Sequence, residues 1–298
     1  METTTPTATK DVYGIVTEKI IEQLGKGIVP WHQPWRDAGL PKNLISGKQY
    51  RGINLMLLAM LGYEQNLFLT YQQVKDIGGK VKKDERGHVV VFWKQEEKQT
   101  NAEQADEAED TAGKKKSVLR YYHVFNIAQC ENLPEKYQAL EIEPVLNLAC
   151  EDMYNNMPNR PPIKFKEQQA YYNPLQDFIN MPKHKSFESN EAYYSTLWHE
   201  LIHSTGHHSR CNRKDLIEMS EFGSDAYSNE ELTAEIGSCY LQQLAGITTQ
   251  FEQSTAYIQN WLLKLKYDKR LIITAAGQAQ KGVDYILNVK SESDEPKD

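Results

Sequence analysis

Long apolar runs and paired cysteines are both scarce in this chain of 298 residues. No stretch approaches the roughly 18 consecutive apolar residues that a membrane-spanning helix requires, and the polar, threonine-rich residues 1–10 lack the apolar core of a secretory leader. The four cysteines lie far apart and form no Cys-x-x-Cys pair, which argues against a zinc ribbon and a disulfide framework. These absences predict a cytoplasmic protein with reduced thiols and no membrane partner.

The composition is that of a globular protein, with 40% hydrophobic and 25% charged residues. Its length suggests two domains. The net charge of −7 is unevenly distributed: the first 95 residues hold 13 Lys and Arg against 9 Asp and Glu, whereas residues 118–298 hold 17 against 25. A mildly basic front half is compatible with binding of a polyanion, and the excess of four charges is too small to prove it.

A His-Glu-x-x-His sequence at residues 199–203 is the most specific chemical signal in the chain. Apolar residues around it recur at the spacing of one helix face, which predicts a helix over 191–207. Residues four apart lie on one side of a helix, so His199 and His203 can bind one divalent metal, with zinc as the first choice. Glu200 would reach a metal-bound water and activate it as the catalytic base of a hydrolase.

The third metal ligand must come from elsewhere in the chain. A metzincin would place its third histidine where Ser209 stands, so that class is disfavoured. The predicted helix 229–244 offers Glu231 and Glu235 on one face, in a pattern similar to the Glu-x-x-x-Asp element of thermolysin-like gluzincins. That similarity implies Glu231 as the ligand and Glu235 as the residue that orients a histidine. Because glutamate replaces aspartate at the second position, Glu235 also stands as an alternative ligand.

Two questions about this site stay open in the sequence. Ser228 and Glu231 also fit a capping box, in which Glu231 would only close the start of the helix. A tetrahedral oxyanion would need a second electrophile beside the metal, and the sequence does not choose among His207, His208 and Tyr227.

Aromatic rings alternate with basic residues in the first third of the chain. Residues 27–36 contain two tryptophans and two prolines, which excludes a helix interior and predicts an extended segment that displays its rings. Bases of single-stranded nucleic acid stack on such rings while Lys and Arg neutralise phosphates. The candidate DNA-binding residues are Trp31, Trp35, Lys42, Asn43, Lys48, Tyr50, Arg51 and Asn54. The tryptophans could instead be core residues of a small domain.

Hydrophobic periodicity and turn residues predict the other elements. Helices are expected at 11–24, 55–61, 70–77, 255–265 and 271–287, and strands at 89–93, 118–127, 164–173 and 178–182. The two strands 89–93 and 118–127 would form a hairpin. Residues 95–117 are acidic and lack large apolar side chains, so they would form a disordered insertion at its tip.

Motifs in both halves resemble one protein family, in the same order along the chain. The front half contains Gly-Ile-Val-Pro-Trp-His-Gln-Pro-Trp, Pro-Lys-Asn-Leu-Ile-Ser-Gly-Lys-Gln-Tyr-Arg-Gly-Ile-Asn and Thr-Tyr-Gln-Gln-Val-Lys. The back half contains His-Glu-Leu-Ile-His-Ser-Thr-Gly-His, Glu-Glu-Leu-Thr-Ala-Glu-Ile-Gly and Trp-Leu-Leu-Lys-Leu-Lys-Tyr-Asp. These sequences resemble ArdC-type antirestriction proteins. The resemblance implies an N-terminal domain that binds single-stranded DNA, a zincin-like metallopeptidase domain, and a mobile-element protein that protects incoming DNA from restriction.

We therefore predict an α+β protein with a single-stranded-DNA-binding domain over residues 1–145 and a mostly helical zincin-like domain over residues 146–298. The predicted activity is that of a zinc-dependent metallopeptidase, a hydrolase directed to proteins on single-stranded DNA. The alternative is a protective DNA-binding protein whose metal site is structural or vestigial. A nuclease is weaker, because a single His-Glu-x-x-His site lacks the carboxylate cluster of a two-metal phosphodiesterase.

Overall fold

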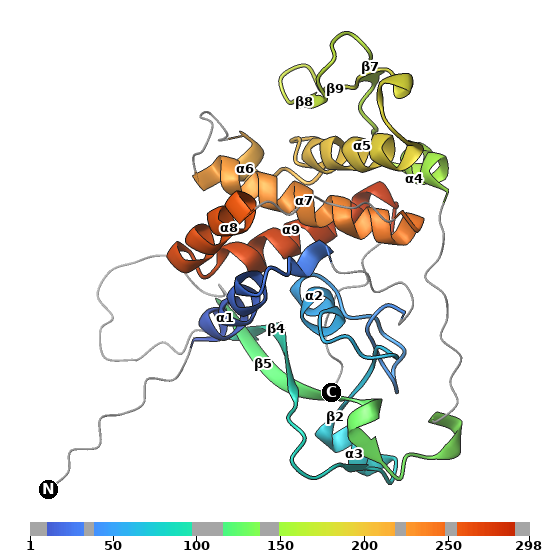
Figure 1. Ribbon diagram of the computed structural model, residues 1–298, viewed down its shortest axis with the longest axis vertical. Coiled ribbons are helices and arrows are strands. Elements are labelled where there is room, and N and C mark those ends of the chain that lie inside the picture. Colours follow the sequence, from blue (N-terminus) through green and yellow to red (C-terminus); the bar gives the residue numbers. More distant parts are fainter. Residues whose placement is uncertain are drawn as a thin grey trace, which may run out of the picture.

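The structure is a computed structural model that describes residues 11–32, 39–96, 116–137, 149–217, 225–247 and 255–289. Three layers follow one another along its long axis, namely a small unit of strands, a layer of helices and a mixed domain of helices and strands (Figure 1). The front half of the chain forms the mixed domain, and the back half forms the other two layers. The predicted α+β class with a mostly helical back half is thereby confirmed.

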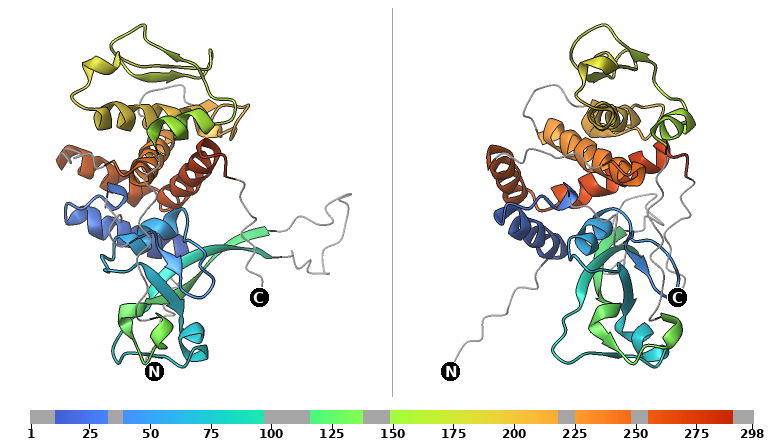
Figure 2. Two further views of the ribbon diagram at one scale, coloured as in Figure 1. Left: turned by 90° about the vertical axis from the view of Figure 1, so that its right-hand side faces the viewer. Right: turned by 45° about the vertical axis from the view of Figure 1, so that its right-hand side comes forward.

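A four-stranded sheet in the order β1–β2–β5–β4 is the centre of the front domain. The long strand β5 (Lys116–Asn126) pairs antiparallel with β2 (Leu67–Thr70) and β4 (His88–Glu96), and β1 (Lys42–Asn43) adds in parallel to β2. The predicted β4–β5 hairpin is confirmed, and the two strands project from the body of the protein (Figure 2). Most of the predicted insertion, residues 97–115, lies outside the described residues.

Smaller elements complete the front domain. Thr70 caps the following helix, because its hydroxyl accepts the backbone N–H of Gln73 and the side-chain oxygen of Gln73 accepts the backbone N–H of Thr70. The remaining elements are α3 (Tyr71–Asp76), β3 (Lys80–Val81), η2 (Ile127–Gln129), β6 (Cys130–Glu131), which pairs with β3, and η3 (Glu135–Tyr137).

Two helices of the front domain flank this sheet. α1 (Val12–Gly25) buries Val16, Ile20 and Leu24, which recur four residues apart on one face, as the periodicity predicted. α2 (Ile53–Ala59) is almost entirely buried and contacts β4. These two helices lie between the sheet and the back half of the chain (Figure 1).

The back half is built on a pair of packed helices, α5 (Asn190–Thr205) and α7 (Asp225–Ala245). Gly237 of α7 allows a close approach, because a Cβ at that position would lie 2.7 Å from Cδ1 of Ile202 in α5. The surrounding helices are α6 (Lys214–Ile217), α8 (Thr255–Tyr267) and α9 (Leu271–Ile286). Among the residues that the structure describes, no helix is both long and apolar enough to cross a membrane.

The strand unit covers α5 on the side away from α7 (Figure 1). The prediction of one strand over 164–173 was wrong, because the segment bends around the buried Asn180. The side chain of Asn180 accepts the backbone N–H of Lys166 at 3.0 Å and donates to the carbonyl of Gln169 at 2.5 Å. The elements of this region are α4 (Cys150–Asn156), β7 (Ile163–Lys164), β8 (Tyr171–Asn173), β9 (Phe178–Asn180) and η4 (His184–Ser186), with the strand order β7–β9–β8.

Specific polar contacts join the front domain to the back half. Tyr240 donates its hydroxyl hydrogen to the carbonyl of Gly52 at 3.0 Å, and the N–H of Gly52 donates to Gln280 at 3.0 Å. Arg51 forms an ion pair with Asp284 of α9. The predicted domain boundary near residue 145 lies outside the described residues and stays a prediction.

Candidate metal centre

Helix α5 presents both histidines because its start is capped and one of its faces is apolar. Ser189 accepts a hydrogen bond from a backbone N–H of the first turn at 3.1 Å, which fixes where the helix begins. Leu197 and Leu201 are buried against the core. His199 and His203 lie one turn apart and face α7, as the four-residue spacing predicted.

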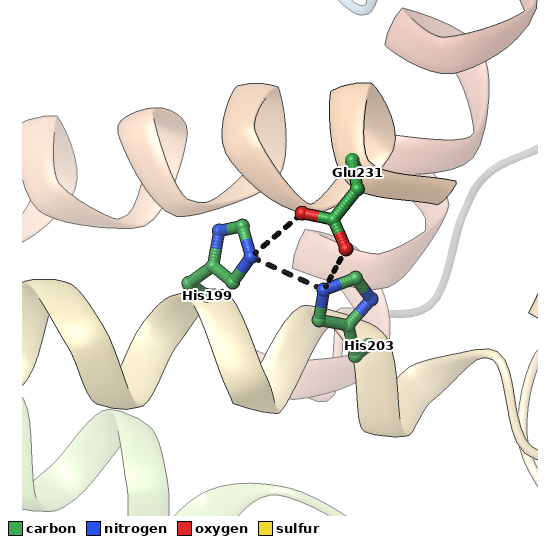
Figure 3. Close-up of side chains that lie close together, drawn as sticks. All are labelled: His199, His203 and Glu231. Carbon is green, nitrogen blue, oxygen red and sulfur yellow. Dashed lines mark hydrogen bonds and ion pairs between the residues drawn. The ribbon is translucent and has the colours of Figure 1, made fainter. Parts of the chain in front are cut away.

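Glu231 of α7 completes a group of three side chains that surround one point (Figure 3). The Nε2 atoms of His199 and His203 lie 3.1 Å apart. The two carboxylate oxygens of Glu231 lie 3.5 Å from Nε2 of His199 and 3.6 Å from Nε2 of His203. The structure therefore brings together the three residues that the sequence named as ligands.

The spacing of these atoms fits a shared metal ion. Zinc with bonds of about 2.1 Å to four tetrahedral ligands holds neighbouring ligand atoms about 3.4 Å apart, and one ligand atom from each of the three residues lies within 4.8 Å of the other two. A set of two imidazoles and one carboxylate also matches the donor chemistry of catalytic zinc, which keeps a further position for water or substrate. The residues present thus fit one divalent ion, as the sequence predicted.

Opposite charges at the metal centre shift the pKa values of His199 and Glu231 toward their ionised forms. Burial lowers the pKa of His199, but the carboxylates of Glu231, Glu200 and Glu235 outweigh it and raise that pKa above its ordinary value. Burial likewise raises the pKa of Glu231, but its hydrogen bond with His199 and the charges of both histidines hold it below the usual range. Glu231 is consequently an anion that faces the two imidazoles, as a metal ligand must be.

Glu230, which the sequence analysis missed, orients one of the histidines. Its carboxylate is fully buried and its Oε1 lies 3.0 Å from Nδ1 of His203. A carboxylate at Nδ1 fixes the ring orientation and leaves Nε2 for a metal. The similarity to gluzincins implied this role for Glu235, so that assignment is corrected to Glu230 for His203. The sequence offered no signal, since three glutamates share this helix.

Arg213 neutralises the buried Glu230 and ties it to the end of α5. Its guanidinium donates to both carboxylate oxygens of Glu230, at 2.9 and 2.5 Å. The same group donates to the carbonyl of Ile202 at 2.7 Å and to the hydroxyl of Thr205 at 2.5 Å. Burial opposes ionisation of Glu230, but Arg213 and His203 hold its pKa below the usual range. The result is a rigid ionic support beneath His203.

A pocket of about 270 Å³ lies between α5 and α7 beside His199. Glu200 is part of its wall, next to the predicted metal position, where the proposed catalytic base is needed. Glu235 also lines the pocket and accepts hydrogen bonds from Tyr257 at 2.6 Å and from His32 at 3.0 Å. Among the described residues, the group able to share one ion contains Glu231 and does not include Glu235.

The structure also separates the candidates for the second electrophile. Tyr227 lies beside the metal centre, where burial, the charge of Glu231 and a hydrogen bond to that carboxylate raise its pKa. His207 is turned toward Ser209, 2.8 Å from its hydroxyl, and His208 is exposed. Tyr227 is therefore the candidate that contacts a predicted ligand.

The capping-box alternative for Glu231 is wrong. Helix α7 begins at Asp225, three residues before Ser228, so both members of the supposed box lie inside the helix. A capping box requires its serine at the boundary, where the first N–H groups lack partners. Glu231 is thus free of that structural duty and faces the histidines of α5.

Comparison with known proteins identifies the family to which this chain belongs. The zincin-like metallopeptidases match residues 155–278, and the N-terminal domain of the anti-restriction factor ArdC matches residues 10–125. The metal-free crystal structure of the antirestriction protein ArdC from plasmid R388 has 38% sequence identity and a TM-score of 0.70, and the match covers 93% of this chain and 97% of that one. The chain belongs to the ArdC family.

Other relatives of this ArdC-type chain extend the comparison. The Mn(II)-bound structure of the R388 protein has 37% identity and a TM-score of 0.71, and the match covers 94% of this chain and 98% of that one. A protein of uncharacterised function from Sinorhizobium fredii is 32% identical over 97% of this chain and 95% of its own length. A DNA primase, TraC, from Escherichia coli is 33% identical over 93% of this chain, which spans only 20% of the primase.

The predicted DNA-binding residues of this ArdC-type chain do not form one surface. Trp31 lies in η1 (Pro30–His32) and is fully buried, with its ring edge-on to Trp261 of α8 at 6.3 Å between centroids. Its interpretation as a displayed stacking residue is therefore wrong, because the ring is part of the core that joins the two halves. Trp35 lies outside the described residues, so its assignment stays a prediction.

Two further candidates have structural partners. Asn54 bonds both backbone groups of Val91, accepting its N–H at 2.8 Å and donating to its carbonyl at 2.7 Å. This amide satisfies the outer edge of β4, so Asn54 is a structural residue and its assignment to DNA is corrected. Arg51 is engaged with Asp284 between the domains.

The other candidates remain near the sheet surface. Asn43 shapes a turn, since its side-chain oxygen accepts the backbone N–H groups of Ile45 and Ser46. Tyr50 is half-buried and hydrogen-bonds to Asn43 and to Tyr122 of β5. Lys48 is exposed and Lys42 is half-buried. The assignment of these four residues to DNA binding stays a prediction.

Proposed function

We propose that this chain is a metal-dependent peptidase that acts on proteins bound to single-stranded DNA, in the service of antirestriction. The observation that carries the catalytic part is the convergence of His199, His203 and Glu231 within the distances that one ion requires, with Glu200 in the adjoining pocket. A site that was only structural would gain nothing from Glu200. Zinc is the favoured metal, and the Mn(II)-bound structure of the R388 relative supports a divalent ion.

The chain supplies each group that hydrolysis of a peptide bond requires. A divalent metal held by the three ligands would supply Lewis acidity, which polarises a carbonyl and eases ionisation of water. Glu200 accepts the proton of the attacking water and delivers it to the leaving amine. Glu230 holds His203 in the tautomer that presents Nε2. Tyr227 can donate its hydroxyl hydrogen to the oxyanion, and its raised pKa keeps that hydrogen in place.

A strip of side chains on the β4–β5 hairpin supports the DNA-binding part. Phe92 pairs across from Arg120 and Val90 pairs across from Tyr122, so these side chains share one face of the hairpin. Tyr122 is 37% exposed and its ring lies 5.7 Å from that of Phe92. Arg120 and Lys94 are exposed on the same face. Rings flanked by cations are what bases and phosphates of single strands require.

The substitution Glu200→Gln tests the peptidase against the protective binding protein. It keeps the size of the side chain and removes the base, so bound zinc and DNA affinity should be unchanged while hydrolysis of a DNA-bound protein falls by about 10²–10⁴-fold. Zinc content by elemental analysis and cleavage followed by electrophoresis measure the two quantities. Equal cleavage by wild type and variant would leave only the binding function.

A further inference from the structure

The pocket beside the metal centre has the size and position of a subsite for one substrate side chain. Its lining consists of Ser195, Thr196, His199, Glu200, Glu235, Ser238 and Cys239. Its volume is about 270 Å³, well above the roughly 10–15 Å³ that one water molecule needs on the same measure. It therefore has room for a long side chain such as that of arginine, which has seven heavy atoms beyond Cα.

The pocket extends from the metal centre along both helices in the same direction. Its α5 residues reach back from His199 to Ser195, and its α7 residues continue from Glu235 to Cys239, beyond Glu231. The two helices are joined at the distal end, where Ser238 donates a hydrogen bond to the carbonyl of Ser195 at 3.2 Å. A peptide whose carbonyl lies at the metal centre would thus direct a neighbouring side chain into this pocket.

The lining is acidic and polar. It contains the carboxylates of Glu200 and Glu235, the hydroxyls of three further residues and no lysine or arginine. An acidic substrate side chain would meet two like charges, and an aliphatic one would cover the two carboxylates while offering neither of them a hydrogen-bond donor. A cationic side chain would be attracted by the two carboxylates and would also donate hydrogen bonds to them.

Glu235 is held in place before any substrate arrives. The hydrogen bonds that Glu235 accepts from Tyr257 and from His32 both use Oε1, and among the described residues none uses Oε2, which keeps its capacity as an acceptor. The rings of the two donors are stacked, with an interplanar angle of 18°. His32 comes from the front domain, so this half of the chain helps to hold Glu235 in place. A carboxylate fixed in advance costs little ordering when it pairs with a ligand.

We propose that this pocket receives a lysine or arginine side chain of the protein substrate and that Glu235 is the residue that selects it. The inference rests on the proposed peptidase function and names the class of side chain beside the cleaved bond. Glu200 stays the proton carrier, while the Oε2 atom of Glu235 accepts hydrogen bonds from the ammonium or guanidinium group.

Binding to the zinc-loaded Glu200→Gln chain tests the subsite without relying on turnover. The probes are fluorescein-labelled pentapeptides Ala-Ala-Xaa-Ala-Ala, in which Xaa is lysine, arginine, norleucine or glutamate, measured by fluorescence anisotropy. The two basic peptides should bind at least roughly tenfold more tightly than the norleucine peptide, and the glutamate peptide most weakly. Adding Glu235→Gln should bring the basic and norleucine peptides to the same affinity, while Glu188→Gln, an exposed acid outside the pocket, should leave the preference intact.

Each other outcome overturns the subsite. Equal affinities in the Glu200→Gln chain, a preference that survives Glu235→Gln, or no binding of the basic peptides would each contradict it. Zinc content and a thermal melt establish that the Glu235→Gln chain is folded; if it is not, the comparison among the four peptides decides alone. Cleavage by the wild type is assayed separately, so a chain that prefers basic peptides without cleaving them would refute the peptidase function and leave the subsite standing.

Discussion

The metal centre and the DNA-binding surface of the front domain were both predicted from groups of residues that lie close together in the sequence. The structure brings the predicted metal ligands together, whereas it gives several of the predicted DNA-binding residues structural roles. In the back half, His199, His203 and Glu231 meet around one point. In the front half, Trp31 is buried in the core and Asn54 closes the edge of a strand. Residues four apart on one helix have side chains on the same side, so the sequence alone predicts that they lie together. A mixture of aromatic and basic residues does not predict which of their side chains face solvent.

Substitutions of the neighbouring glutamates of α7 have the largest expected effects and test the assignments at the metal centre. Glu230→Gln leaves the buried Arg213 without its anion, so the metal-free protein should lose about 3–5 kcal/mol of unfolding free energy. Loss of the support for His203 should also weaken zinc binding by about 10–100-fold. Urea unfolding of the metal-free protein and zinc titration measure the two effects.

Glu231→Gln is the matched control, one residue along the same helix. It removes a predicted ligand but keeps the Arg213–Glu230 pair, so zinc affinity should fall while the metal-free protein keeps nearly all of its stability. If both variants unfolded with the same free energy, the division into an ionic support and a ligand would be contradicted.

The sequence predicted the long helices of the back half because their apolar faces are local features, although α7 begins at Asp225, before the predicted start at residue 229. It predicted His199 and His203 for the same reason, since both lie on one helix. Glu230 and His32 could not be found that way, because their partners lie 27 and 203 residues away in the chain. Their roles depend on how α7 turns against α5 and on how η1 docks beside α8, which no local pattern encodes.

Replacement of Trp31 tests whether the front cluster serves the fold or the DNA. Because the ring is fully buried and packs on Trp261, Trp31→Ala should cost about 3–5 kcal/mol of unfolding free energy. At a temperature where the variant is still folded, its affinity for single-stranded DNA should equal that of the wild type. A loss of affinity with unchanged stability would restore the original interpretation of a stacking residue.

The exposed strip on the hairpin should behave in the opposite way. Tyr122→Ala should weaken binding of an oligothymidine by about 1–3 kcal/mol, because a base loses its stacking surface. Tyr121→Ala is the matched control, since alternate residues of a strand face opposite sides and Tyr121 is also exposed. Equal losses for the two variants in an anisotropy titration would place the DNA elsewhere than on this face.

Salt dependence separates the cation of this strip from its ring. Arg120→Gln should reduce the slope of log affinity against log salt by about 0.7, the value for one phosphate contact of a single strand. Tyr122→Ala should lower the affinity and leave the slope unchanged, because stacking releases no counterions. The same titrations at several potassium chloride concentrations give both slopes, and an unchanged slope for Arg120→Gln would exclude a phosphate contact there.

The smallest expected effect comes from a second arginine–carboxylate contact in the back half, which is less buried than that of Glu230. Asp177 accepts hydrogen bonds from Arg210, at 3.1 Å for one of them, and from Tyr172 at 2.8 Å. Burial raises the pKa of Asp177, but these partners outweigh it and hold the pKa below its ordinary value. Asp177→Asn should cost about 1 kcal/mol at pH 7, less than Glu230→Gln, since the side chain of Asp177 is 34% exposed to water although that of Arg210 is buried.

The pH dependence of the difference in unfolding free energy between wild type and Asp177→Asn distinguishes an ionic contribution from a loss of packing. Because the folded-state pKa of Asp177 lies below the unfolded value of about 3.9, its stabilisation is complete above that value and is lost as the pH falls through the folded-state pKa. The gap between wild type and Asp177→Asn in urea unfolding should therefore be constant from pH 7 to about pH 5 and shrink below about pH 4. A gap that stays constant under acid would mean that Asp177 supports the strand unit through shape and hydrogen bonding alone.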